Sequence, residues 1–303
     1  MAVTINVIGG GRAGRALARV WALNGAFTIG DVLDPSSAAG ADAVAFIGSG
    51  RAVAALGEMR GADVWMLTPP DDQIVPCGKA LAASGLLQSG NVVFHCSGAL
   101  PSRDLAAVMT NGVAVASVHP LKSFADPAAA AQSFSGTYCA AEGDAAALAV
   151  LRPAFERIGA RVFEIDPAFK TIYHAASVIV CNYLVALLET GIRSYEKSGF
   201  KRDDALRVME PLVRETLDNV FRLGTAEALT GPIARGDHAV VARQVDALEA
   251  WDPRVAAIYK NLGVVAVELA RAQGKADPDA LAAIGRLLSG DNQSPMSYVQ
   301  SRQ

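Results

Sequence analysis

The sequence predicts an α/β protein in two parts: a domain with a mainly parallel sheet over residues 1–165 and an all-helical domain over residues 166–303. Up to about residue 165, short β-branched runs alternate with Ala-rich stretches of helical period, the pattern of successive βαβ units. After Asp166 the strand signals stop, and Asp-Pro recurs at 166–167, 252–253 and 277–278, each time before a helical pattern. Asp accepts free N–H groups at a helix start and Pro lacks one there, so each pair predicts a helix.

Seven strands are expected in the first domain, each a short β-branched or apolar run bounded by turn residues. They cover residues 4–8, 27–33, 63–67, 91–95, 113–117, 137–140 and 161–164. The last residues, "SGDNQSPMSYVQSRQ", are predicted to form a tail.

Composition and charge narrow the function classes. The chain is 51% hydrophobic and 19% charged, with a net charge of −3 and no block of Lys or Arg, which disfavours nucleic acid and favours a small molecule as the partner. The four cysteines, Cys77, Cys96, Cys139 and Cys181, have no CxxC spacing, and the four histidines have no HxxxH pair. We therefore expect reduced thiols in a cytoplasmic protein, and no metal.

No membrane segment is expected. The chain enters its first strand directly after Met1, without the basic and small-residue pattern of a signal peptide. The longest apolar run, "AASVIVCNYLVALL", is interrupted by Asn182 and is shorter than the roughly 20 residues that span a bilayer. It is predicted to form a buried helix.

The stretch "INVIGGGRAGRALARVWALNG" predicts a dinucleotide site. Gly9, Gly11 and Gly14 stand in GxGxxG register between an apolar strand and a helix. In this fingerprint the first glycine permits a tight turn, the second admits the pyrophosphate and the third lets helix and strand pack closely. Arg12 and Ala13 lie inside the loop, where they would contact the phosphates at the helix N-terminus.

Acidic residues near the end of the second strand bear on the type of dinucleotide. Asp34, or failing it Asp31, is the candidate to bind the ribose 2′-hydroxyl, which slightly favours NAD; Arg12 keeps NADP open. Both aspartates could instead cap or solvate the loop. Thr68 and Pro69 follow the third expected strand, where open α/β sheets bind ligands, and are further cofactor candidates.

With the fingerprint in place, the chain resembles the 6-phosphogluconate-dehydrogenase-like reductases, and within them the bacterial proteins that join a Rossmann-like domain to a DUF2520 domain. Those proteins often bear the label of F420-dependent NADP oxidoreductase. The resemblance spans nearly the whole chain through "INVIGGGRAG", "VVFHCSGAL", "VHPLKSFADP", "YHAASVIVCNYLVALL" and "LTGPIARGD". Relatives often carry Ser-Arg after the second strand, which suits a 2′-phosphate, whereas this chain has "DVLDPSS".

Candidate catalytic residues lie at the start of the second domain. Lys170 and His174 are four residues apart, so on a helix they share a face, about 40° and 6 Å apart, and Ser177 continues that stripe. Related β-hydroxyacid dehydrogenases and ketopantoate reductases have a Lys and then an Asn at this spacing, which implies that Lys170 is an acid/base residue and that His174 takes the Asn position. Alternatively, Lys170 lies at the domain boundary and His174 is a core histidine.

Further candidates follow expected strands. Ser97, in His95-Cys96-Ser97-Gly98, could bind substrate or cofactor, with His95 facing the site or packing beneath the loop. A nucleophilic role for Cys96 is disfavoured. The His119-Pro120 pair resembles that of prephenate dehydrogenases. The candidate substrate-binding residues are His119, Lys122, Asn182 and Arg235. Arg235 could instead form an ion pair with Asp237. Asn182 is about 120° round the helix from Lys170 and could instead lie in the helical core or a dimer interface.

The sequence thus predicts a cytoplasmic NAD- or NADP-dependent oxidoreductase that transfers a hydride between nicotinamide and a C=O or C=N carbon of a small anionic metabolite. The resemblance implies a homodimer formed through the helical domain. Two other functions are compatible with the sequence: a dinucleotide-binding sensor or scaffold without turnover, and an F420-dependent NADP reductase.

Overall fold

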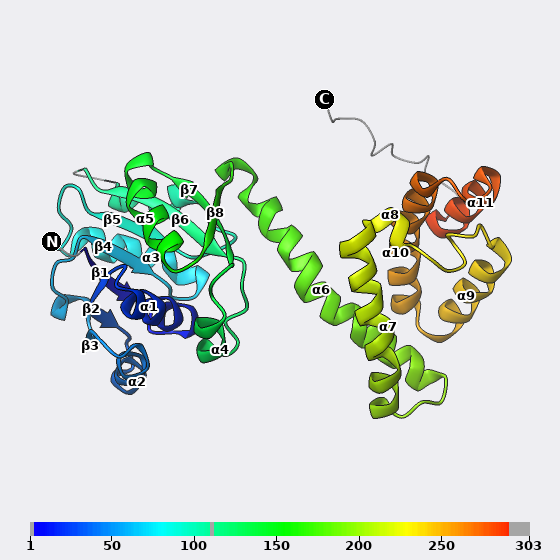
Figure 1. Ribbon diagram of the computed structural model, residues 1–303, viewed down its shortest axis with the longest axis horizontal. Helices are drawn as coiled ribbons and strands as arrows, with labels where there is room; N and C mark the ends of the chain where they lie inside the picture. The colour runs from blue at the N-terminus through cyan, green and yellow to red at the C-terminus, as the bar shows by residue number, and fades with distance from the viewer. Residues whose placement is uncertain (1–2, 110–111, 291–303) are drawn as a thin grey trace. The chain divides into compact units, whose positions relative to one another are not determined.

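The computed structural model describes residues 3–109 and 112–290, and its first domain is built on one sheet (Figure 1). The strand order is β3-β2-β1-β4-β5-β6-β7-β8. The strands are β1 (Thr4–Ile8), β2 (Thr28–Leu33), β3 (Arg51–Val53), β4 (Val64–Leu67), β5 (Val92–His95), β6 (Ala114–Pro120), β7 (Tyr138–Gly143) and β8 (Arg161–Glu164). All neighbours pair in parallel except β6 and β7, which are antiparallel.

The predicted mainly parallel α/β fold is therefore confirmed, with one strand missed. β3 has only three residues and its sequence, RAV, has no alternating pattern, so pairing with β2 rather than local preference makes it a strand. The other expected strands are present with ends that differ by at most a few residues.

Helices cover both faces of the sheet. In the first domain these are α1 (Arg12–Asn24), α2 (Ser37–Ile47), α3 (Asp71–Ala83), α4 (Pro127–Gln132) and α5 (Ala145–Arg157), with short 3₁₀ segments η1 (Leu56–Glu58), η2 (Ser102–Val108) and η3 (Pro167–Phe169). Alternate strand residues enter two separate cores, because successive side chains of a strand point to opposite faces: Met66 packs on the α1 and α5 side, and Trp65 and Leu67 pack on the α3 and η2 side.

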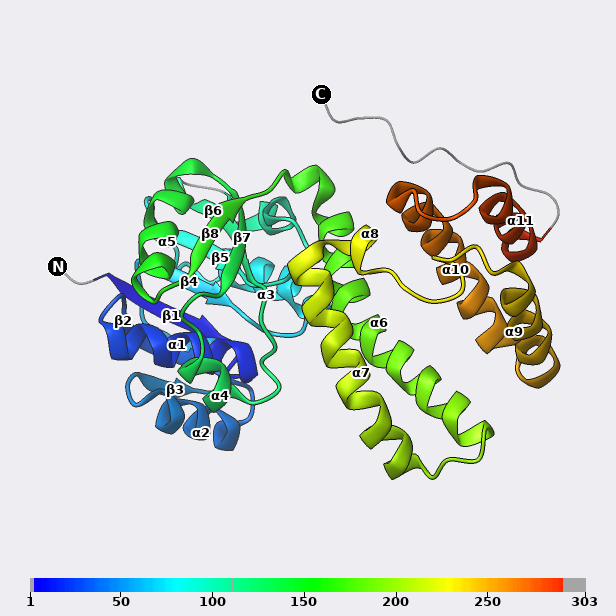
Figure 2. The same cartoon turned by 45° about the vertical axis from the view of Figure 1, so that its right-hand side comes forward.

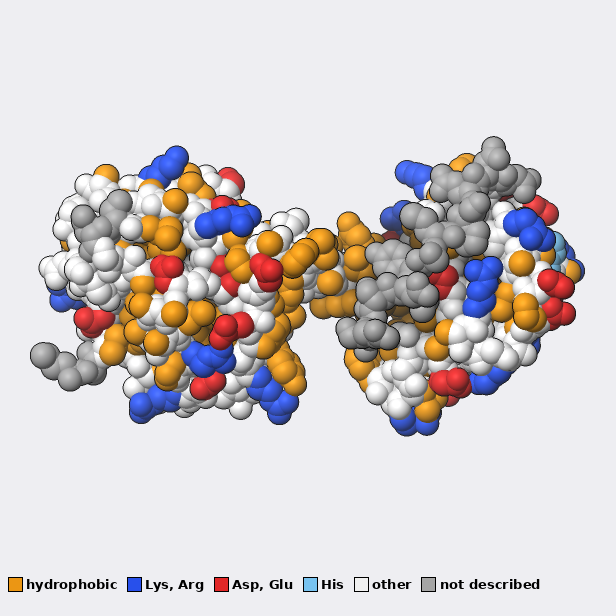
Figure 3. All heavy atoms as spheres, turned by 90° about the horizontal axis from the view of Figure 1, so that it is seen from above, with side chains coloured by type: hydrophobic (Ala, Val, Ile, Leu, Met, Phe, Trp, Pro, Cys, Tyr) orange, Lys and Arg blue, Asp and Glu red, His pale blue; other side chains and the backbone are white. Residues whose placement is uncertain are grey.

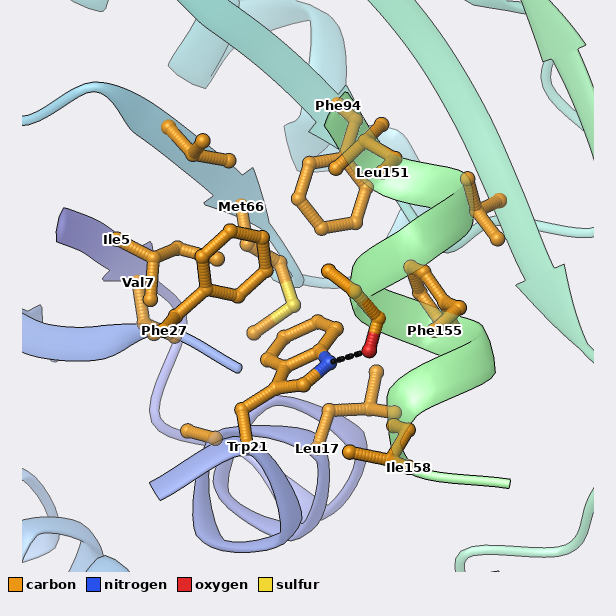
Figure 4. Packing of buried hydrophobic residues seen from close by; sticks show 14 of the residues in the cluster. Ile5, Val7, Leu17, Trp21, Phe27, Met66, Phe94, Leu151, Phe155 and Ile158 are labelled. Carbon is orange, nitrogen blue, oxygen red and sulfur yellow. Dashed lines mark hydrogen bonds between the residues drawn. The ribbon is translucent and has the colours of Figure 1, made fainter. Parts of the chain in front are cut away.

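An aromatic cluster fills the first of these cores (Figure 4). Trp21 of α1 is fully buried and meets Phe27, Phe94 and Phe155 edge to face, with ring centroids 5.2 to 6.3 Å apart. Its indole N–H donates to the Ala154 carbonyl oxygen, 3.3 Å away. This packing joins α1, which follows the glycine loop, to α5 on the same face of the sheet.

The remaining helices are those predicted for the second domain, and no strand occurs after β8 in the described part of the chain (Figures 1 and 2). They are α6 (Lys170–Lys197), α7 (Arg202–Leu223), α8 (Thr225–Ala228), α9 (His238–Trp251), α10 (Pro253–Gln273) and α11 (Pro278–Ser289). All three Asp-Pro predictions are confirmed: Asp166, Asp252 and Asp277 each accept a backbone N–H at the start of η3, α10 and α11.

The chain divides into two compact units within α6, Met1–Tyr183 and Leu184–Gln303. The sequence placed a boundary at residue 165, where β8 ends. The first unit extends further because Lys170, at the start of α6, is buried against the sheet.

The prediction of a buried helix over "AASVIVCNYLVALL" was wrong for the chain by itself. Ile179, Val180 and Val185 are 58%, 66% and 68% exposed, and Asn182 is exposed too, not inside a helical core. The apolar run is part of α6, a helix of 28 residues. By length and composition alone, this is the helix in the described residues that could cross a membrane, with an 18-residue window of mean hydropathy 1.7 that is 6% buried.

The predicted C-terminal tail begins at Ser289, which is instead the last residue of α11; from residue 291 onward the tail lies outside the described residues.

Candidate functional site

The glycine loop has the geometry that its sequence predicts. Gly9 has a φ of 106°, and a Cβ there would lie 2.6 Å from the carbonyl carbon of Thr68. A Cβ on Gly14 would collide with the Gly9 carbonyl oxygen and the Thr68 hydroxyl. Beside Gly11, by contrast, a Cβ would meet nothing within 4 Å. Two glycines are therefore required by packing, and the third leaves open space at the N-terminus of α1.

These residues fit a dinucleotide. The open side of Gly11 admits a pyrophosphate to free N–H groups at the start of α1, where the helix dipole favours an anion. Arg12 is exposed there, and Ala13 is the next residue of the first turn. Thr68 closes the loop from β4, because its hydroxyl donates to the Gly9 carbonyl oxygen at 2.9 Å, and Pro69 packs beside it.

The structure separates the two candidate aspartates. Asp31 is fully buried and forms ion pairs with Arg51 and Arg60, which hold the pKa of its carboxyl well below the ordinary range although burial opposes this. It stabilises the β2–β3 edge and has no free oxygen for a ribose. Asp34 is half-buried, and its Oδ2 atom lies 3.3 Å from where a Cβ on Gly10 would be, so it borders the glycine loop.

The segment after β5 is held by hydrogen bonds to the buried side chains of His95 and Ser97. His95 is fully buried beneath the loop, where its Nδ1 accepts the Ser97 N–H and its Nε2 lies 3.5 Å from the Pro101 carbonyl oxygen. The Ser97 hydroxyl donates to Asp71 Oδ2 at 2.8 Å and accepts the N–H groups of Ala99 and Leu100. Asp71, in the first turn of α3, thus orients this loop.

Cys96, in the same loop, is not set up as a nucleophile. Burial raises the pKa of its thiol, and the nearby Cys139, whose own pKa burial raises to about 12, acts in the same direction. The reactive form of cysteine is the thiolate, which this environment disfavours.

Two histidines meet Gly98. A Cβ on this glycine would collide with His174 Nδ1 and lie 2.8 and 2.9 Å from His119 Cε1 and Nε2. The two imidazole centroids are 5.8 Å apart, and the other nitrogen of His119, Nδ1, is 2.9 Å from the Tyr173 hydroxyl. His174 Nδ1 is the buried side-chain nitrogen left without a hydrogen-bond partner among the described residues.

Lys170 lies one turn before His174 but faces a different environment. Its ammonium is 1% exposed, and it donates to Glu142 Oε1 at 2.8 Å and to the Ser117 hydroxyl. Burial lowers the pKa of Lys170, and the Glu142 carboxylate offsets part of that shift. Glu142 (on β7), Ser117 (on β6) and Tyr173 were missed by the sequence reasoning, although a lone Glu in the apolar run "YCAAEG" was a usable signal.

The other candidates have hydrogen-bond partners of their own or belong to the second unit. The Lys122 ammonium donates to the Ser133 carbonyl oxygen at 2.8 Å, and Ser177 donates to the Tyr173 carbonyl oxygen at 3.5 Å. Arg235 is exposed and belongs to the second unit. Its expected ion pair with Asp237 is not formed, since Asp237 caps α9 by accepting the Val240 N–H at 3.2 Å.

The sheet brings the loops of the site together. β1, β4 and β5 are parallel neighbours, so the glycine loop, Thr68-Pro69 and the Ser97-Gly98 segment follow their carboxyl ends at one edge. Ligands of open α/β sheets bind at this edge. Within residues 3–109 and 112–290, no group of three or more His, Cys, Asp or Glu side chains could hold a metal ion.

Residues 137–266 match the family model described as "Domain of unknown function (DUF2520)". The first domain therefore has a Rossmann-type fold, and the segment from β7 into α10 matches DUF2520. No curated protein matches this chain.

Solved structures share the fold. Protein TM1727 from Thermotoga maritima is 26% identical, with a TM-score of 0.71 over 89% of this chain and 99% of its own. A Bacteroides fragilis protein named "putative NADP oxidoreductase BF3122" is 20% identical, with a TM-score of 0.68 over 90% and 98%. The reductive aminase from Aspergillus terreus, in complex with NADPH and ethyl-5-oxohexanoate, is 13% identical, with a TM-score of 0.59 over 95% and 93%.

The buried histidines make stability depend on pH. Burial and the Lys170 charge lower the pKa of His95 from 6.5 to about 4. The unfolded chain therefore takes up a proton near pH 6.5 and the folded chain only near pH 4. We expect the contribution of His95 to the free energy of unfolding to be fully present above pH 6.5. As the pH drops to 4, this contribution should fall by about 3 kcal/mol.

Urea unfolding followed by circular dichroism between pH 7.5 and 4 measures this. His95→Gln should weaken the dependence on pH, whereas His238→Gln, at an exposed histidine, should leave it unchanged. Equal pH dependence in the wild type and His95→Gln would contradict the assignment.

Proposed function

We propose that this protein is an NAD(P)-dependent oxidoreductase that transfers a hydride between nicotinamide and a C=O or C=N carbon of a small anionic metabolite. One observation carries the proposal: the open glycine loop and the Gly98 segment, which meets two histidines, follow parallel strands at one edge of the sheet. Two proteins of similar fold, one named as an NADP oxidoreductase and one a reductive aminase in complex with NADPH, support the same class.

The cofactor would supply the hydride. The protein would bind and orient the cofactor and the substrate, and would exchange the proton with the substrate. Gly11 and Arg12 would hold the pyrophosphate at the start of α1, and Asp34, beside Gly10, would lie toward the adenosine ribose. Beside Gly98, His174 is the residue we assign to the proton. Imidazole is the side chain that most often does this, and in reduction the hydride goes to carbon while the proton goes to its oxygen or nitrogen.

His119 would bind the same polar atom of the substrate. Burial, together with the charges of His174 and Lys170, lowers its pKa to about 4, so the ring is neutral near pH 7. The Tyr173 hydroxyl, whose pKa burial raises to about 12, engages Nδ1 and leaves Nε2 on the Gly98 side. A neutral imidazole N–H is a hydrogen-bond donor to a carbonyl or carboxylate oxygen.

The function is tested with NADH or NADPH deuterated at C4 and three probes: 1-pyrroline-5-carboxylate, a short 2-oxo acid, and ethyl-5-oxohexanoate with an amine. We expect deuterium transfer to the carbon of an anionic probe. His174→Ala should lower kcat by about 10²- to 10⁴-fold with an unchanged cofactor Kd, because the proton donor is lost. His238→Gln is the control. Cofactor binding without deuterium transfer to any probe would favour a sensor, and bleaching of F420 would favour an F420 reductase.

We further propose a slight preference for NAD, because the Asp34 carboxylate borders the loop and would repel a 2′-phosphate. Asp34→Ser should raise the affinity for NADPH relative to NADH by about tenfold or more, the effect of about 1.4 kcal/mol of removed repulsion. Fluorescence titration measures both Kd values. Asp42→Ser, at an exposed carboxylate on α2, is the matched control. An unchanged ratio for Asp34→Ser would contradict this role.

We also propose that the protein is a cytoplasmic homodimer, in which a second copy covers the exposed apolar surface of the helical domain. Hydrophobic side chains line the exposed stretch of α6 (Figure 3), and Phe221 on α7 is 87% exposed. The second unit also has an apolar pocket of about 410 Å³, lined among others by Leu187, Met209 and Ile258. Apolar surface of this extent is typical of a protein interface. All four cysteines are free, as in a reducing compartment.

Analytical ultracentrifugation measures this state. The wild type should sediment as a dimer, and Val180→Glu or Val185→Glu should shift it to monomer, because a charge would be buried without a partner. Leu23→Glu, at a residue 71% exposed on α1, should stay dimeric. A monomeric wild type that binds lipid vesicles would show that a membrane covers α6 instead.

A further inference from the structure

A buried polar network connects the first turn of α6 to the loop that carries Gly98. At its centre is the Lys170 ammonium, which is 1% exposed and has two acceptors, Glu142 Oε1 and the Ser117 hydroxyl. These acceptors lie opposite each other on β6 and β7, where Ser117 and Glu142 are register partners of the antiparallel pair.

Each acceptor continues to one end of the loop. The Ser117 hydroxyl donates to the Ser97 carbonyl oxygen at 3.3 Å, directly before Gly98. Glu142 accepts the Ser102 N–H at 2.8 Å through Oε1 and the Ser102 hydroxyl at 2.6 Å through Oε2. The loop from Ser97 to Ser102 is thus bracketed by the two partners of one ammonium.

The same ammonium also fixes where His174 lies. Lys170 is the first residue of α6, and His174 is one turn further on the same face. Because Lys170 is anchored in the sheet, its helix turn is anchored too, and the His174 ring packs against the Cα of Gly98. Since a Cβ on Gly98 would collide with the His174 ring, there is little room for either the ring or the loop to move toward the other.

We infer that Lys170 and Glu142 are positioning residues: their ion pair holds the Gly98 loop and the first turn of α6 together, so that His174 is presented to the substrate. The inference rests on the proposed function for the role of His174. A lysine side chain that is 1% exposed, with its ammonium bound by two protein acceptors, does not reach a substrate atom, so Lys170 is not the acid/base residue that the resemblance implied. Ser117 and Ser102 transmit its position to the loop.

A buried ion pair has a property that separates positioning from catalysis. Removal of one partner leaves an uncompensated buried charge, whereas replacement of both by neutral groups of similar volume is often tolerated. Glu142→Gln keeps an oxygen and an N–H for Ser102, and Lys170→Met keeps the volume of the stem. A positioning pair is therefore rescued by the double substitution, and a proton donor is not.

The test uses the full chain as Lys170→Met, Glu142→Gln and the double variant, with Lys275→Met, Glu227→Gln and their double as controls at an exposed pair. Each single change at the buried pair should lower the Tm by about 10 °C and the double should recover most of it. The ¹⁵N resonance of the His174 ring, assigned with His174→Asn, should shift in Lys170→Met and return in the double variant. The control pair should change neither quantity.

Turnover of a reducible probe completes the test. Lys170→Met should lower kcat by about 100-fold through misplacement of His174, and the double variant should return to within about tenfold of the wild type. A double variant as inactive as Lys170→Met would show that Lys170 is the proton donor and would overturn the inference. Additive losses of Tm would overturn it too. If the wild type reduces no probe, the proposed function fails, while the Tm and ¹⁵N measurements still decide the network.

Discussion

The structure around the site depends on one buried ammonium group, that of Lys170, whose charge has to be balanced by hydrogen-bonded partners. A charge with 1% exposure is stable only with close, hydrogen-bonded partners, and Lys170 finds them in Glu142 and Ser117. That requirement joins α6 to β6 and β7 and, through Ser97 and Ser102, to the loop after β5. Elements far apart in the chain are thereby fixed around Gly98.

The antiparallel strand makes this arrangement possible. β7, with β8 parallel to it, runs opposite to the other strands of the sheet, and the register of β7 with β6 sets Glu142 opposite Ser117. Because the two side chains lie on one face, a single ammonium can contact both. The glycine loop lies on the parallel strands β1 and β4 and has no such ion pair, since close packing of Gly9, Gly14 and Thr68 defines its shape. One sheet thus supports a closely packed glycine loop and a Gly98 loop that is held by an ion pair.

The helical part poses a different physical problem. Apolar side chains on α6 and α7 have to be removed from water, yet Val180, Val185 and Phe221 are mostly exposed in the single chain. The hydrophobic composition of these helices indicates only that burial is favourable. It does not indicate which surface covers them. In the proposed homodimer a second copy would cover this surface with the same residues on both sides, as a two-fold interface requires.

Local signals in the sequence determined the strand and helix pattern, the glycine loop and the three Asp-Pro helix starts, because each acts over a few neighbouring residues. The sequence also indicated His119 and His174 as candidates, but it did not indicate that both contact Gly98. The choice between Asp31 and Asp34, and the partners of Lys170, 28 and 53 residues away, were decided by tertiary structure. Whether a charge is paired and buried depends on strand order and register, which bring distant residues together and which no local pattern encodes.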